Sequence, residues 1–160
     1  MLEAIETRNQ KVYNDLYHET NRNLEEFIKD AGDNKIHFSA NAPFQQANYS
    51  NEKAFSLLNE YKDLTKQLRK KETQMKFGYD LFNITYVSPP EMEQVELEIE
   101  RLESVWKTKN EWNNQWEDTK LIKFKDFDNE VLDDLAEEYY QKLNSYPKEM
   151  KKWEIVNSVK

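Results

Sequence analysis

The sequence contains no cysteine, only two glycines and only four prolines. Without cysteine the chain can form neither a disulfide nor a thiolate zinc site, which suits a reducing intracellular compartment. So few glycines and prolines supply few of the turn residues that many short strands require. A β-sandwich or β-barrel is therefore disfavoured.

Long hydrophobic runs are also missing, and the charge is unbalanced. The apolar residues never form a continuous stretch, so we expect no signal peptide, no anchor and no membrane-spanning helix. Acidic residues outnumber basic ones by 31 to 23, which gives a formal net charge of −8. This excess should repel polyanions, so we expect no nucleic-acid partner and no direct binding to the acidic surface of a microtubule.

What the sequence does contain is a mixture of charged and aromatic residues. Charged residues make up 34% of the 160 residues, hydrophobic residues 38% and aromatic residues 13%. This balance is typical of amphipathic helices with narrow apolar stripes. Apolar residues recur at steps of three, four and seven, and the chain length fits one domain. We therefore predict an all-α fold, an elongated antiparallel bundle of about five helices with one longer ordered loop at about 32–50.

Punctuating residues set the expected boundaries within 1–160, which we interpret as a single helical-bundle fragment. Gly32, in the Ala-Gly-Asp-Asn stretch 31–34, favours the end of a helix. The Ser-Pro-Pro-Glu stretch 88–91 favours the start of one, and Asp128 can cap another after a break at 121–128. The expected segments are a helix at 1–31, a loop at 32–50, helices at 51–86, 88–120 and 128–146, and a short helix at 147–160.

Apolar residues at helical spacing predict the core. In the first two helices they are Leu2, Ile5, Val12, Leu16, Leu24, Phe27, Ile28, Leu57, Tyr61, Leu64, Leu68, Met75 and Phe82. In the later helices they are Met92, Val95, Ile99, Leu102, Val105 or Trp106, Trp112, Trp116, Val131, Leu132, Leu135, Tyr139, Leu143, Tyr146, Met150, Trp153, Val156 and Val159, and Lys109 falls at one further core position. Gly78 interrupts the second stripe, so we expect a bend or a close helix approach there.

Catalytic and ligand-binding patterns are missing from the sequence. Gly32 and Gly78 stand alone, and neither precedes the lysine of a phosphate-binding loop. His18 and His37 have no partner residues at the spacing of a metal site or a catalytic triad. We therefore predict no catalytic, cofactor-binding or metal-binding residue in this chain.

Large aromatic residues are the remaining candidates for function, either as core or as interaction sites. Trp106, Trp112, Trp116 and Trp153 all lie in the second half, and at each of them core is favoured over interface. Phe82 lies on the second apolar stripe. In the expected loop, Phe44 and Tyr49 are candidates for contact with a neighbour. The basic stretch 69–71 is interpreted as a solvated face.

Several of these pieces occur in an order that resembles a known family. The pieces are the stretches Phe-Ser-Ala-Asn-Ala-Pro-Phe (38–44) and Phe-Gly-Tyr-Asp-Leu-Phe-Asn-Ile (77–84), the group Leu102, Val105 and Trp106, then Trp112 and Trp116, Phe-Lys-Asp-Phe-Asp (124–128), and the ending from Pro147 to Trp153. From Phe38 onward the chain resembles dynein heavy chains of the axonemal type, in the helical region where the tail leads into the linker. The first 30 residues match only in helical character.

The resemblance implies a mechanical role. In dynein heavy chains the linker is a helical lever that crosses a ring of ATPase modules, and the tail joins neighbouring chains. The chain would then be a non-catalytic, force-transmitting piece of a far longer motor protein that binds ATP and Mg²⁺ elsewhere. The implied partners are other parts of the heavy chain and neighbouring heavy, intermediate or light chains, in the cytoskeleton of a cilium or flagellum. The alternative is a stand-alone helical scaffold or tethering module of the spectrin-like type.

Overall fold

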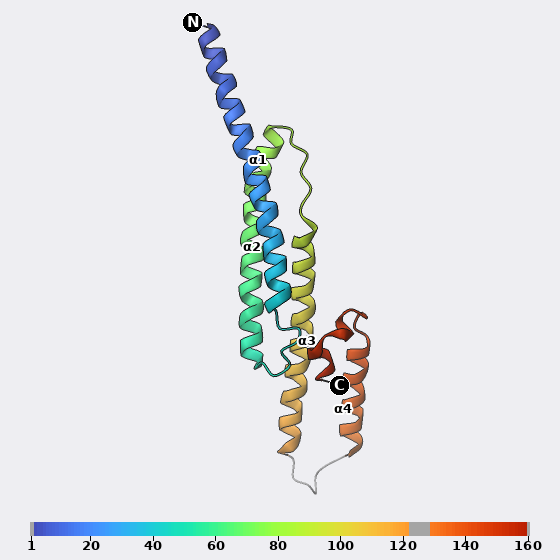
Figure 1. Cartoon of the computed structure of the whole chain (residues 1–160). Helices are drawn as coiled ribbons and strands as arrows, with labels where there is room; N and C mark the ends of the chain where they lie inside the picture. The colour runs from blue at the N-terminus through green and yellow to red at the C-terminus, as the bar shows by residue number, and fades with distance from the viewer. Residues whose placement is uncertain (1, 122–128, 160) are drawn as a thin grey trace. The chain divides into compact units, whose positions relative to one another are not determined.

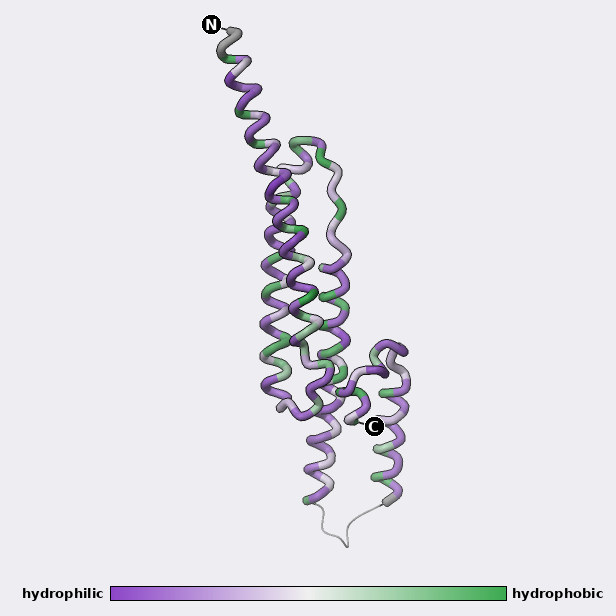
Figure 2. Tube along the Cα trace, in the orientation of Figure 1, coloured by the Kyte–Doolittle hydropathy of each residue, from purple (hydrophilic) through white to green (hydrophobic). Residues whose placement is uncertain are grey.

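The computed structural model describes residues 2–121 and 129–159. Over these residues the chain forms five α-helices, one short 3-10 helix and no strand (Figure 1). The elements are α1 (Leu2–Asn41), α2 (Asn51–Leu81), α3 (Pro90–Lys120), α4 (Asn129–Asn144), η2 (Met150–Lys152) and α5 (Glu154–Asn157). The predicted all-α class is therefore confirmed. Figure 2 shows hydrophilic residues predominating along these helices, with hydrophobic residues recurring at intervals.

The contacts of the chain gather in two compact units, where the sequence suggested a single bundle. Unit 1 comprises Met1–Asn41 and Lys62–Glu96, and unit 2 comprises Ala42–Tyr61 and Leu97–Lys160. Helices α2 and α3 therefore each contribute residues to both units.

Helices α1 and α2 run antiparallel within unit 1. Near one end of the pair, the ring of Tyr13 lies 5.2 Å from that of Phe82, and further along Lys71 Nζ lies 2.8 Å from an oxygen of Asp30. Between these two contacts, a Cβ added at Gly78 would lie 3.4 Å from Thr20 Cγ2. Gly78 therefore stands where two helices approach closely, as its place in the apolar stripe predicted.

The first helix is longer than the sequence suggested. The stop expected at residues 31–34 was wrong, because α1 continues through Gly32 to Asn41 and leaves only residues 42–50 as loop. A glycine within a helix costs about 1 kcal/mol relative to alanine. Ala31 and Phe38 lie fully buried on either side of Gly32, and burial of such side chains exceeds that cost.

The second helix is shorter than expected, because it ends at Leu81 and not at residue 86. Asn83 adopts the left-handed conformation, with φ at 52°. The amide of Ile84 donates to the carbonyl of Tyr79, and the amide of Asn83 donates to that of Asp80. These two bonds form a Schellman motif, which satisfies the last carbonyls of the helix and turns the chain away from its axis.

The third helix begins at Pro90, two residues after the expected start. The carbonyl of Pro89 accepts the amide of Met92, so Pro90 occupies the first turn, where its missing N–H leaves no bond unmade. The expected helix at 128–146 is observed as Asn129–Asn144. Of the break expected at 121–128 only Leu121 lies within the described residues, and the expected cap Asp128 lies outside them. The expected final helix at 147–160 is divided between η2 and α5.

The predicted core is confirmed in α3 and only partly confirmed elsewhere. Met92, Val95, Ile99 and Leu102 of α3 are buried as predicted, and the two alternatives for the next position, Val105 and Trp106, are both buried. Several predicted core residues are instead exposed, namely Ile5, Val12, Leu16, Ile28, Leu64, Trp116 and Val131. In α2 the buried stripe runs through Ala54, Leu58, Tyr61 and Thr65, one position away from Leu57 and Leu64. The side chain of Leu2 lies outside the described part of the chain.

Candidate functional site

Unit 1 contains a polar cluster centred on Arg69, which connects α2 to α3. The guanidinium of Arg69 makes two parallel bonds to Glu96 of α3, one of 2.8 Å from Nε and one of 2.7 Å from Nη2. Its Nη1 also donates to Glu72 at 2.9 Å and to the hydroxyl of Ser88 at 2.9 Å. A two-bond arginine–carboxylate pair fixes geometry as well as charge, so this cluster defines how α2 and α3 pack in unit 1.

Tyr86, from the connection that follows α2, belongs to the same cluster. The hydroxyl of Tyr86 donates to Glu72 at 2.6 Å, and the Tyr86 ring stacks on the buried ring of Tyr79 with centroids 4.8 Å apart. Residues from α2, from the connection at 82–89 and from α3 thus meet around one arginine. We refer to Arg69, Glu72, Tyr86, Ser88 and Glu96 as the arginine clamp.

The clamp keeps its members in the charge states that its hydrogen bonds need. The bonds to Glu96 raise the pKa of Arg69 against the opposing effect of burial. Burial opposes ionisation of Glu72, but bonds from Ser88, Tyr86 and Arg69 outweigh it and lower the pKa of that carboxyl. Burial and the bond to Glu72 raise the pKa of Tyr86. Glu72 therefore stays an acceptor and Tyr86 a donor across the neutral pH range.

Unit 2 is held by a tryptophan and a lysine that bind the loop at residues 42–50. Trp106 is fully buried, and its Nε1 donates to the carbonyl of Pro43 at 3.2 Å. One turn later Lys109 donates to the carbonyl of Ala47, and its Nζ lies 4.9 Å from the centroid of the Trp106 ring. Burial lowers the pKa of Lys109, and the charge of Glu154 opposes this shift. Trp106 is therefore core, as the sequence favoured.

The loop is also held by the C-terminal segment of unit 2. The ring of Phe44 meets that of Trp153 edge to face at 5.0 Å, and the amide of Ile155 donates to the carbonyl of Phe44 at 3.2 Å. Phe44 and Trp153 are both half-buried. The ring of Tyr49 faces Lys53 Nζ at 3.8 Å. Phe44 therefore packs within the chain.

The other aromatic candidates lie at two further places. In unit 2 the rings of Trp112 and Trp116 stack 6.2 Å apart, and Trp112 meets Tyr139 of α4 at 5.3 Å. Trp112 is half-buried, whereas Trp116 is 41% exposed. In unit 1 the half-buried ring of Phe82 meets the rings of Tyr13 and Tyr17 at 5.2 and 5.9 Å.

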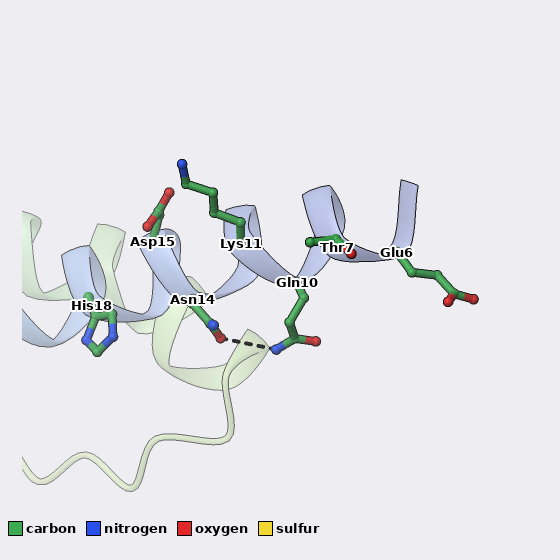
Figure 3. A pocket seen from close by; sticks show the side chains of 7 residues that line it. All are labelled: Glu6, Thr7, Gln10, Lys11, Asn14, Asp15 and His18. Carbon is green, nitrogen blue, oxygen red and sulfur yellow. Dashed lines mark hydrogen bonds between the residues drawn. The ribbon is translucent and has the colours of Figure 1, made fainter. Parts of the chain in front are cut away.

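Two hollows on the described surface are wide open to solvent. One lies along α1 and is lined by Glu6, Thr7, Gln10, Lys11, Asn14, Asp15 and His18, all from that single helix (Figure 3). Gln10 Nε2 donates to Asn14 Oδ1 at 3.1 Å across its floor. Within the described residues no three histidine, aspartate or glutamate side chains gather as a metal site would need. None of the described helices combines the length and apolarity needed to cross a membrane.

The geometry therefore defines a class of protein, an α-helical chain whose best-defined polar and aromatic groups bind its own helices to one another. Comparison with known proteins finds similarity to dynein heavy chains. Over 137 residues the chain is 24% identical to the dynein-1-beta heavy chain of the flagellar inner arm I1 complex of Chlamydomonas reinhardtii, a match that covers 86% of this chain. Over 128 residues it is 20% identical to the human dynein axonemal heavy chain 2, and this match covers 79% of this chain.

The mouse dynein axonemal heavy chain 2 is 23% identical over 95 residues, or 58% of this chain. The chain spans about 3% of the length of the first two relatives and 2% of the third. No family model matches the sequence, and no solved structure matches it. The similarity to axonemal dynein heavy chains that the sequence motifs predicted is confirmed.

The arginine clamp is the feature that the sequence analysis missed. Arg69 lies in a basic stretch that we interpreted as a solvated face, and Tyr86 and Ser88 were placed at helix ends. Two sequence features could have revealed it. Arg69 and Glu72 are three residues apart on one helix, and Asn83 is a residue that tolerates the left-handed conformation needed to turn Tyr86 back.

Proposed function

We propose that this chain is a non-catalytic, force-transmitting segment of a dynein heavy chain, from the region where the tail leads into the linker. The observation that carries the proposal is the similarity over 86% of the chain to a flagellar dynein heavy chain. The same similarity supports a location in the axoneme of a cilium or flagellum. On this proposal ATP hydrolysis belongs to other parts of the parent chain.

The arginine clamp supports the mechanical part of the proposal. A segment that transmits force must resist sliding of one helix along its neighbour. The two parallel bonds between Arg69 and Glu96 oppose such sliding, because a shift along the helix axis breaks both together. Packing of Met92 and Val95 in the same unit adds resistance, since close-packed side chains transmit strain.

The proposed partners follow from the same assignment. They are the other parts of the same heavy chain, together with neighbouring heavy, intermediate or light chains. Exposed aromatic residues such as Trp116 and the half-buried Phe82 are the surfaces we expect these partners to use. The net charge of −8 disfavours nucleic acid and the acidic microtubule surface as direct partners.

The proposal is tested in the full heavy chain that carries this segment. Arg69→Ala should slow microtubule gliding while microtubule-stimulated ATP hydrolysis continues, because a less rigid segment transmits a smaller part of each power stroke. Lys70→Ala, an exposed neighbour outside the clamp, is the matched control. Equal gliding speeds for Arg69→Ala and Lys70→Ala would contradict the mechanical role. A transcript that encodes no ATPase modules would instead favour the stand-alone scaffold.

A further inference from the structure

The face of α1 that packs in unit 1 continues toward the N-terminus as an apolar stripe. Its buried members are Phe27, Ala31 and Phe38. Steps of eleven, four and seven residues, which keep side chains near one face of a helix, lead back from Phe27 to Leu16, Val12 and Ile5. The exposed and buried parts of α1 therefore share one continuous face.

The N-terminal part of this face is open in the described part of the chain. Ile5 is 52% exposed, Val12 50% and Leu16 47%. Within unit 1, the contacts of Tyr13 and Tyr17 with Phe82 lie at the end of α2, and α1 projects beyond them (Figure 1). Three large aliphatic side chains in a row on a charged helix are unusual for a face that meets only water.

The spacing of this stretch is that of a coiled-coil seam. Ile5, Asn9, Val12 and Leu16 follow one another at steps of four, three and four. Such steps define the two inward positions of a heptad repeat. A single asparagine within an otherwise apolar seam lowers the stability of the pairing. We call residues 5–16 the α1 seam.

We infer that the α1 seam pairs with the α1 seam of a second copy of this chain, in antiparallel orientation. In the register that places Ile5 of one copy against Leu16 of the other, Asn9 meets Val12. Both pairings occur twice because the arrangement has two-fold symmetry. This register uses all three exposed aliphatic residues of the seam.

The charges beside the seam select this orientation. With Ile5 against Leu16 of the second copy, Arg8 of each copy lies opposite Asp15 of the other, and Glu6 lies opposite Tyr13. Opposite charges at these flanking positions set partner choice and orientation in coiled coils. A parallel pairing would instead set Arg8 against Tyr13 and Asp15 against Thr20, with no ion pair. Figure 3 shows the side chains of Glu6 and Asp15 projecting from the helix, free of one another.

The pairing does not depend on the proposed function, because the motifs that resemble dynein heavy chains begin only at Phe38. Its strength is limited by its length. About a dozen residues from each copy bury less surface than a permanent dimer requires, so the association should be reversible. We expect monomers at low micromolar concentration and dimers as the concentration approaches millimolar.

The first test measures the molecular mass of the 160-residue chain by sedimentation equilibrium over that concentration range. The intact chain should show a monomer–dimer equilibrium, and Leu16→Glu should weaken dimerisation at least tenfold. Leu97→Glu is the matched control, because Leu97 is 44% exposed but lies on α3. A chain that stays monomeric near millimolar concentration, or equal effects of the two substitutions, would overturn the inference.

The second test uses the charge pair to determine orientation. Arg8→Asp alone should weaken dimerisation, since it sets two aspartates opposite each other, and Asp15→Arg alone should do the same with two arginines. Combining both substitutions in one chain restores an opposite pair, so its dissociation constant should return to within a few-fold of the original. Circular dichroism checks that each variant remains helical. Failure of the double substitution to recover would rule out the antiparallel register.

Discussion

The two compact units achieve stability by different means. Unit 1 is organised around a charged cluster, in which one arginine bonds to two carboxylates and a hydroxyl. Unit 2 is organised around a fully buried tryptophan, and the loop that it binds is held through backbone carbonyls. Charge pairs respond to pH and salt, whereas packed aromatics respond to loss of volume. The two units should therefore be destabilised by different perturbations.

The largest effect is expected from Trp106→Ala in unit 2. The substitution empties a fully buried site and leaves the carbonyl of Pro43 without its indole donor. Large-to-small changes of this kind cost about 3–5 kcal/mol. Hydrogen exchange followed by mass spectrometry should show the loss of protection in unit 2, and chemical denaturation gives its size. Equal loss of protection in unit 1 would remove the contrast between the units.

A smaller effect is expected from Trp112→Ala, also in unit 2. The ring is half-buried and keeps its contact with Tyr139, so its loss should cost about 2 kcal/mol. Trp116→Ala is the natural control, because that ring is 41% exposed and its removal should cost under about 1 kcal/mol. Denaturation of both variants under identical conditions makes the comparison. A larger cost at Trp116 than at Trp112 would show that Trp116, and not Trp112, is the ring of the stacked pair that packs against the rest of unit 2.

For unit 1 the decisive substitution is Arg69→Ala, which leaves Glu72 and Glu96 without their shared cation. Arg69 and Glu96 are each more than a third exposed at the side chain, so solvent screens the pair and the cost should be about 1–2 kcal/mol. Arg69→Lys should recover only part, since an ammonium cannot make the two parallel bonds. Hydrogen exchange in residues 62–96 is the measurement. Unchanged exchange there would mean that apolar packing alone holds the unit.

The sequence predicted the packing of unit 2 better than that of unit 1. Periodicity found Trp106, Leu102 and Val105 because one long helix buries a regular stripe. In the part of α2 that belongs to unit 1 the same method chose Leu64, which is exposed, whereas the buried residue is its neighbour Thr65. Two neighbouring stripes on a polar helix are equally regular, and only the partner helix decides which is covered.

The sequence hints at members of the arginine clamp, but the geometry of the clamp could not be predicted, because it depends on a single backbone torsion. Asn83 ends α2 in the left-handed conformation, and that turn brings Tyr86 and Ser88 back to Glu72 and Arg69. Had the helix continued to residue 86, as the apolar pattern suggested, no clamp would form. Gly32 illustrates the converse, since a residue that favours a helix end is overridden by burial of its neighbours.

The smallest expected effect concerns low pH. It tests whether the difference in stability between the two units also appears when the pH is lowered. Glu72 has a pKa lowered by the bonds it accepts in the folded chain, so ionisation of this carboxyl stabilises unit 1. That stabilisation is complete above the unfolded-state pKa, about 4.3 for glutamate. It is lost as the pH falls through the lower folded-state value.

Glu72→Gln should therefore lower the stability of unit 1 near neutral pH by on the order of 1 kcal/mol. The same variant should also lose less stability than the intact chain when the pH falls below about 4. Glu93→Gln, exposed on α3 within the same unit, is the control that accounts for general acid effects. Stability measured from pH 7 to acid for both variants, with exchange resolved by unit, makes the comparison. Parallel curves for Glu72→Gln and the intact chain would show that the charge of Glu72 contributes nothing, and the arginine clamp would then reduce to the pair of Arg69 and Glu96.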